Sequence, residues 1–222
     1  MPLPPHTDIE LAELIKSIRA AGYLKSASVE KALRAVPRHL FVPKQLTAMA
    51  YRDCPLSIGH GQTISQPSTV VAMTEALQPK RGQKILEVGA GSGWQAGLLG
   101  HIVGPKGMVW TIERIIELVH MAKHNLKAAG IKNVHVIHGD GSMGLPNHAP
   151  FDRIIVTAAC PKIPPLLTTQ LKPKGRMVIP VGDLYLQKMI LLVRKSKDGF
   201  EQTELGNFMF VPLIGRYGFK PV

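Results

Sequence analysis

Short apolar runs alternate with longer amphipathic stretches over the middle and later parts of this chain. Runs of the strand type cover residues 84–88, 108–112, 134–138, 153–158 and 176–181. Stretches with helical spacing cover residues 93–103 and 115–129. Strands that alternate with helices predict a parallel sheet covered by helices on both faces, and ligands bind such sheets at the carboxyl ends of the strands. The pattern therefore predicts a doubly wound α/β fold.

The two ends of the chain have different patterns. Apolar residues at helical spacing follow Thr7, and a second helix is predicted from a Ser28 cap to Val36. Apolar positions near the other end predict antiparallel strands, over 188–195, 200–205 and 208–213. We expect one domain over residues 1–222, with a helical cap and a polar loop in 1–78 and the sheet in 79–222.

The first strand of this series leads directly into a loop with glycine at every second position. Gly89, Gly91 and Gly93 follow Glu87 in the order E-x-G-x-G-x-G. Glycine lets the backbone turn sharply and approach a bound molecule without an intervening Cβ. The dinucleotide pattern G-x-G-x-x-G would need glycine at Trp94 and is missed. What remains is typical of methyltransferases that use S-adenosylmethionine, and a glycine turn without a ligand stays the alternative.

Two later strands also end in residues that suit a nucleoside. Glu113 lies at the end of one strand, where a carboxylate can accept hydrogen bonds from ribose hydroxyls. Asp140 stands between Gly139 and Gly141 after the next strand, where a short acidic side chain can meet the edge of adenine. Either acid alone could be a solvated loop residue. Three strand ends in sequence order with this chemistry favour a nucleoside cofactor.

Size and composition predict a chain that folds by itself. It has 222 residues, 45% of them hydrophobic, and a mean hydropathy of +0.08. It lacks a run of about eighteen apolar residues and a secretory signal pattern at its start. Cys54 and Cys160 lie far apart without metal-ligand spacing, so we expect no disulfide framework. These features predict a monomer in a reducing cytoplasm, without membrane contact.

A formal net charge of +12 raises the alternative of a nucleic-acid partner. The basic residues are spread along the chain, however, and aromatic residues make up only 5% of it, few for base stacking. Cytosine C5 methylation uses a thiolate after proline, and here both cysteines precede proline instead. Amino-group methylation typically has an Asn/Asp-Pro-Pro-Tyr turn, and this chain has Thr157 to Pro161 at that place. The positive charge fits acidic polypeptides equally well, and an RNA or DNA methyltransferase remains an alternative function.

Two pairs of histidines are candidates for metal ligands. His120 and His124 are one helical turn apart but lack the glutamate of H-E-x-x-H. His135 and His138 are predicted on opposite faces of a strand. We therefore expect no metal site.

A polar segment precedes the helix predicted from Ser68. The hydroxyls of Thr63 and Ser65 can line a groove there, since Pro67 favours an extended backbone at Gln66. The same residues also fit a simpler alternative, in which they are a polar segment before the N-terminus of a helix.

These segments together resemble the protein-L-isoaspartate O-methyltransferase family. The most specific match is the run Thr63-Ile64-Ser65-Gln66-Pro67. Further matching segments are Val36 to Arg38, Phe41 to Pro43, Glu87 to Gln95, Thr111 to Arg114, Phe151 to Thr157, Gly175 to Gly182 and Phe210 to Leu213. Ser68 departs from the family pattern, in which this position is usually aromatic or histidine.

The resemblance implies a fold, a cofactor and a site. The fold would be the class I methyltransferase sheet, Rossmann-like, seven-stranded and mostly parallel. The cofactor would be S-adenosylmethionine, bound without a metal and released as S-adenosylhomocysteine. It would contact residues at the strand ends, namely Glu87, Gly89, Gly91, Gly93, Glu113, Asp140, Gly141 and Thr157. Isoaspartyl residues of damaged proteins would be held by Thr63, Ile64, Gln66, Val211 and Pro212, with Ser65 in the active role. A scaffold that binds the cofactor without catalysis is a third hypothesis.

Overall fold

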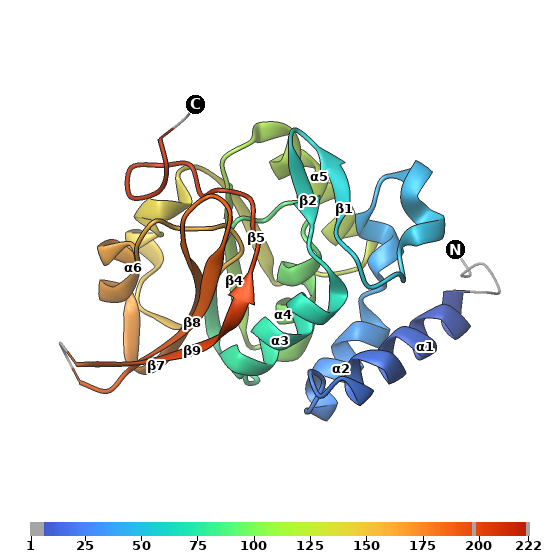
Figure 1. Ribbon diagram of the computed structural model, residues 1–222, viewed down its shortest axis with the longest axis horizontal. Coiled ribbons are helices and arrows are strands. Elements are labelled where there is room, and N and C mark those ends of the chain that lie inside the picture. The colour runs from blue at the N-terminus through green and yellow to red at the C-terminus, as the bar shows by residue number, and fades with distance from the viewer. Residues whose placement is uncertain (1–6, 197–198, 221–222) are drawn as a thin grey trace.

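A seven-stranded sheet forms the centre of the computed structural model, which describes residues 7–196 and 199–220 (Figure 1). The strands are β3 Lys84–Val88, β4 Met108–Glu113, β5 Val134–His138, β6 Phe151–Val156, β7 Leu171–Gly182, β8 Gln187–Arg194 and β9 Phe200–Phe208. Their spatial order is β5-β4-β3-β6-β7-β8-β9. The first five in this order run parallel, and β8 and β9 add antiparallel pairs. The predicted doubly wound, mostly parallel fold is confirmed.

The direction of strand addition reverses at β3. The chain moves from β3 to β4 and β5 on one side, then returns to place β6 against the other side of β3. Connections therefore leave β3 and β6 in opposite directions, which opens a crevice beyond their carboxyl ends. The glycine loop follows β3 at this point.

Helices pack against both faces of the sheet. These are α3 Pro67–Leu77, α4 Trp94–Val103, α5 Ile116–Ala128 and α6 Pro165–Thr169, while α1 Thr7–Ala20 and α2 Ala27–Ala35 pack on other helices. Ile85 and Ile155 share a core with α3 and α4 on one face. Leu86 and Ile154 pack on the other face with Leu167 of α6. Burial on both faces explains why these strands appear in the sequence as continuous apolar runs.

The N-terminal helices lie at one end of the molecule, opposite β7, β8 and β9 (Figure 1). Ile18 and Leu33 from this cap share a core with Trp94 and Leu98 of α4. The cap is therefore anchored on the helix that follows the glycine loop. No helix in residues 7–196 and 199–220 is long and apolar enough to cross a membrane.

Two predicted local features are wrong. The cap of α2 is Ser26 and not Ser28: the Ser26 backbone is extended and its Oγ accepts a hydrogen bond from the Val29 amide at 3.4 Å. Residues 208–213 do not form a strand of their own, because β9 continues to Phe208 and the chain then leaves the sheet edge. Phe210 and Leu213 are buried there, and Ala159 in the loop after β6 exchanges backbone hydrogen bonds with Val211 and Leu213.

Two elements were not predicted. A short antiparallel hairpin of β1 Leu56–Gly59 and β2 Gln62–Ile64 carries the start of the polar segment. Its strands cover only four and three residues, so the alternation of Leu56 and Ile58 with Ser57 and Gly59 is too short to predict a strand. The helix α6 covers only five residues and begins at Pro165, directly after Pro164, which gives little helical periodicity.

Candidate active site

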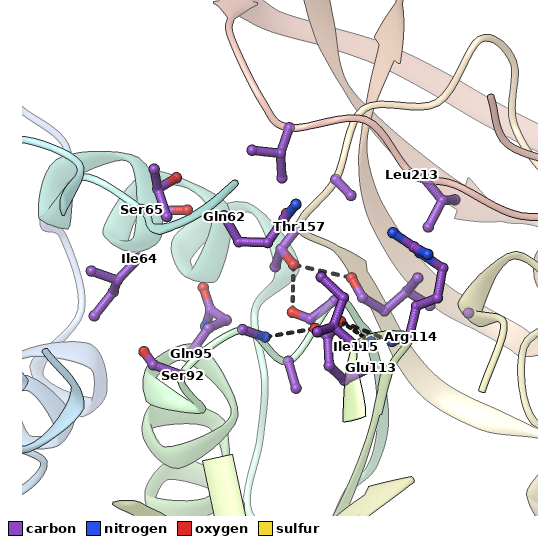
Figure 2. A pocket seen from close by; sticks show the side chains of 18 of the residues that line it. Gln62, Ile64, Ser65, Ser92, Gln95, Glu113, Arg114, Ile115, Thr157 and Leu213 are labelled. Carbon is purple, nitrogen blue, oxygen red and sulfur yellow. Dashed lines mark hydrogen bonds between the residues drawn. The ribbon is translucent and has the colours of Figure 1, made fainter. Parts of the chain in front are cut away.

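A cavity opens at the carboxyl ends of β3, β4 and β6, as the crevice at β3 predicts (Figure 2). The strand ends contribute Gly89, Gly91, Glu113, Gly141 and Thr157 to its lining. The polar segment contributes Thr63, Ile64 and Ser65, and the chain after β9 contributes Val211 and Pro212. The fold therefore brings together ten of the predicted site residues, from segments up to about 150 residues apart in the sequence.

The glycine loop has a backbone that only glycine adopts without strain. Gly89 and Gly93 have φ of +95°, and Gly91 has φ of +51°. A Cβ on Gly89 would collide with the Thr157 hydroxyl, and one on Gly93 would lie 3.3 Å from Ala122. Gly89 and Gly91 line the cavity, whereas Gly93 caps α4 and packs against α5. The loop thus presents backbone directly to any ligand in the cavity.

The carboxylate of Glu113 organises the cavity wall. It accepts hydrogen bonds from the backbone amide of Gly91 at 3.0 Å and from the amides of Arg114 and Ile115 at 2.8 and 3.0 Å (Figure 2). A carboxylate offers about four acceptor positions, so about one remains for a ligand. Glu113 is buried at the sheet edge and couples β4 to the glycine loop.

Thr157 lies at the end of β6, directly beside the glycine loop. Its hydroxyl is 2.6 Å from the carbonyl oxygen of Gly89 and 3.0 Å from that of Val88, and its amide donates to Val88. In Figure 2 it lies between Ser65 on one side and Glu113 on the other. The Thr157 hydroxyl therefore occupies the space that a Cβ on Gly89 would need.

Three predicted cofactor residues lie outside the lining, namely Gly93, Asp140 and Glu87. The Asp140 carboxylate accepts hydrogen bonds from the amide and hydroxyl of Ser142, at 2.9 and 2.7 Å, and from the amide of Arg216 at 2.8 Å. It thus holds the C-terminal segment, while its neighbour Gly141 faces the cavity.

Glu87 lies beneath the loop and is fully buried. Burial raises the pKa of its carboxyl to about 8; the hydroxyl of Thr111 opposes this shift and the charge of Glu113 adds to it. Glu87 and Thr111 are register partners on β3 and β4. The Glu87 carboxyl is therefore largely protonated at pH 7 and lies in the core beneath the loop.

A second cavity adjoins the first on the side of the polar segment. It is lined by Tyr23, Pro55, Thr63, Ser65, Gln66, Ser68, Thr69, Thr157, Asn207, Phe208, Met209, Phe210 and Val211. None of these lining residues carries a formal charge, in a chain with a net charge of +12. Four of them, namely Thr63, Ser65, Thr157 and Val211, also line the first cavity. Gln66 faces only the second cavity.

Sequence reasoning missed several lining residues. Ser92 lines the first cavity from the glycine loop, and Gln95 lines it from the first turn of α4. Their position within and next to the glycine motif could have identified them from the sequence. Tyr23 and Met209 line the second cavity from opposite ends of the chain. Nothing local in the sequence links these two residues.

The surroundings of Cys160 do not favour thiolate chemistry at this residue. Cys160 is buried, which raises the pKa of its thiol to about 12 and disfavours a nucleophilic thiolate. Within residues 7–196 and 199–220, no group of three His, Cys, Asp or Glu side chains is placed to hold a metal ion.

Comparison with known proteins decides the family. Residues 10–218 match the family model described as Protein-L-isoaspartate(D-aspartate) O-methyltransferase. The chain belongs to this family. A protein-L-isoaspartate O-methyltransferase from Hyperthermus butylicus is 50% identical over 93% of this chain and 89% of its own. One from Methanococcoides burtonii is 47% identical over 93% of this chain and all of its own.

Solved structures of protein-L-isoaspartate O-methyltransferases share the fold. One has a TM-score of 0.85 at 30% identity and covers 94% of this chain and 67% of its own. A Plasmodium falciparum protein described as a putative member has a TM-score of 0.80 at 24% identity, covers 91% of this chain and 97% of its own, and contains S-adenosyl-L-homocysteine. The resemblance drawn from the glycine loop and the Thr63 to Pro67 run is confirmed.

Proposed function

We propose that this chain transfers the methyl group of S-adenosylmethionine to the free carboxylate of L-isoaspartyl residues in proteins and peptides. Membership of the protein-L-isoaspartate O-methyltransferase family supports this reaction. The observation that carries the proposal is the wall shared by the two cavities, formed by Thr63, Ser65, Thr157 and Val211. A cofactor in the first cavity and a peptide in the second would meet at Ser65.

The first cavity suits S-adenosylmethionine. Gly89 and Gly91 leave the cavity free of Cβ atoms where the methionine part would lie. The remaining acceptor position of Glu113 suits a ribose hydroxyl, because three backbone amides already occupy the others. Gly141 would face adenine, and the sulfonium of the bound cofactor would supply the methyl group.

The carboxylate of the substrate needs no base to activate it. A free carboxyl has a pKa of roughly 4, so it is already ionised at pH 7. Histidine is absent from the described residues that line either cavity. The protein must instead remove water from the carboxylate and align it with the methyl carbon, at about 3 Å. A carboxylate oxygen then bonds to this carbon as the carbon–sulfur bond breaks, giving a methyl ester and S-adenosylhomocysteine.

Ser65 would hold the carboxylate in this alignment. Its side chain lies on the wall between the cavities, and its hydroxyl can donate one hydrogen bond to a carboxylate oxygen. Ile64, Val211 and Pro212 add apolar surface, which helps to exclude water. Thr63 and Gln66 supply polar groups for the backbone of the peptide.

The test uses two peptides that differ only in one linkage. The protein is incubated with S-adenosylmethionine labelled in its methyl group and with a peptide that contains either Asp or isoAsp at one position. We expect base-labile label only in the isoAsp peptide, and equal labelling of both peptides would contradict the proposal. Parallel reactions with tRNA and duplex DNA test the nucleic-acid alternative, which the net charge of +12 favours.

A further inference from the structure

A single buried arginine connects the polar segment to the cofactor cavity. Arg38 lies in the turn Arg38–Phe41 after α2 and is only 1% exposed. A buried charge is normally paired with an opposite charge. Among the residues that the structure describes, however, Arg38 has no carboxylate within 4 Å.

The Arg38 guanidinium donates instead to three backbone carbonyls. Its Nη1 donates to Ala50 at 2.7 Å, and its Nη2 donates to Cys54 at 3.0 Å and to Ser65 at 3.1 Å. These carbonyls come from three separate positions, before β1 and after β2. One rigid guanidinium therefore ties the hairpin and the polar segment to the N-terminal cap.

The same guanidinium packs against the start of α4. Its central carbon lies 5.4 Å from the ring centre of Trp94, the first residue of α4 after Gly93. The Trp94 indole donates to the carbonyl of Val36 at 3.0 Å, which fixes the ring. Trp94 also lines the first cavity. Arg38 thus contacts both the segment that carries Ser65 and the helix that follows the glycine loop.

Ser65 depends on this contact because the hairpin ends before it. The register of β1 and β2 pairs Leu56 with Ile64 and goes no further. Helix α3 begins at Pro67, which has no amide hydrogen to donate. Within the described part of the chain, the hydrogen bond recorded for the Ser65 carbonyl comes from Arg38.

We propose that Arg38 is a positioning residue, which places Ser65 against the cofactor cavity by holding the Ser65 carbonyl. The role in turnover rests on the proposed function. Burial lowers the pKa of Arg38 to about 10, so the guanidinium is still charged at pH 7. Lysine at this position would offer one nitrogen in place of a planar fork, and it cannot reach three separated carbonyls in the same way.

The first test separates substrate turnover from cofactor binding. In Arg38→Lys and Arg38→Met, we expect kcat/KM for the isoAsp peptide to fall by about tenfold and about 100-fold, since charge-assisted hydrogen bonds are lost. The affinity for S-adenosylhomocysteine, measured by calorimetry, should stay within about threefold. Arg34→Met is the matched control, because Arg34 is exposed and pairs only with Glu30 in the described contacts. Unchanged turnover, or a parallel loss of cofactor affinity, would overturn the proposal.

The second test does not depend on turnover. Hydrogen–deuterium exchange of the wild type and of Arg38→Lys is compared for segments 62–69 and 84–93. We expect exchange to rise by at least about tenfold in 62–69 and to change little in 84–93, because Arg38 holds only the former by hydrogen bonds. Equal protection of 62–69 in both proteins would refute the positioning role. If the wild type methylates no peptide, the proposed function fails while this exchange result still decides the role of Arg38.

Discussion

The two walls of the candidate active site are built in different ways. The wall around Gly89, Gly91, Glu113 and Thr157, which we propose contacts the cofactor and call the cofactor wall, is made by the sheet. Gly89 and Ala90 donate backbone hydrogen bonds to Ile112, and Thr157 donates to Val88. The wall that carries Ser65 extends beyond a two-stranded hairpin, and side chains hold it. Arg38 holds the Ser65 carbonyl, while Asp53 accepts hydrogen bonds from the Gln66 side chain at 3.2 Å and from the Ser68 amide at 2.8 Å.

Because the two walls are built differently, we expect cofactor affinity and peptide turnover to be affected by different substitutions. Backbone contacts between parallel strands depend on the fold as a whole, so the cofactor wall should change only when its backbone is forced to move. Contacts from side chains can be removed one at a time, so the Ser65 wall should change with single substitutions. Cofactor affinity and peptide turnover should therefore respond to different residues.

The largest expected effect comes from a methyl group on the cofactor wall. Gly89→Ala places a Cβ against the Thr157 hydroxyl and requires φ of +95° from alanine. We expect affinity for S-adenosylhomocysteine to fall by about 100-fold, measured by calorimetry, because the loop must move into the cavity. Gly130→Ala is the matched control, since Gly130 has φ of +71° and nothing within 4 Å of its Cβ position. Equal affinity in Gly89→Ala and the wild type would contradict the backbone model of this wall.

A smaller effect is expected from the side chains that hold the Ser65 wall. Asp53→Ala removes the acceptor for Ser68 at the start of α3, so we expect a loss of about 1 kcal/mol in unfolding free energy. The peptide KM should rise by about fivefold while cofactor affinity is retained, since the contact lies on the peptide side. As a control, Asp183→Ala also removes a carboxylate that accepts two hydrogen bonds, from the amides of Tyr185 and Leu186 in the β7–β8 turn. It should lose stability without a change in KM, and a matching KM change would contradict the prediction.

The last prediction concerns the pH dependence of stability and the acid beneath the glycine loop. The pKa of Glu87 is raised from 4.5 to about 8, so the folded state keeps a proton that the unfolded state loses as pH rises through this window. The wild type should therefore lose stability relative to Glu87→Gln between about pH 4.5 and 8, by at most about 1.4 kcal/mol per pH unit, and the difference should level off outside this range. Urea unfolding at several pH values measures it. Parallel stability curves for the two proteins would show that the Glu87 carboxyl is not held protonated.

The sequence predicts the cofactor wall better than the Ser65 wall for a physical reason. Gly89 directly follows β3 and Glu113 is the last residue of β4, so the local pattern predicts the place of both at the carboxyl edge of the sheet. Arg38 contacts Ser65 across 27 positions, and Asp53 contacts Ser68 across 15. Such contacts depend on how the N-terminal part of the chain packs on the rest of the protein. No periodic pattern in the local sequence predicts them.

Asp140 shows the same limit within the cofactor wall. Its position between two glycines predicts a role near adenine, and Gly141 does line the cavity. The Asp140 carboxylate, however, holds Arg216 and Ser142. The C-terminal segment was predicted only to form antiparallel strands. The hydrophobic pattern therefore did not predict that the residues after these strands contact Asp140.

The most direct test of the separation between the two walls is the Ser65→Ala variant. Calorimetry gives its affinity for S-adenosylhomocysteine, and steady-state kinetics gives kcat/KM for the isoAsp peptide, with Ser57→Ala on the exposed edge of β1 as the matched control. We predict an affinity within about twofold of the wild type and a kcat/KM lower by about tenfold to 100-fold, since one oriented hydrogen bond to the reacting carboxylate is lost. A parallel loss of cofactor affinity, or full turnover, would contradict the account.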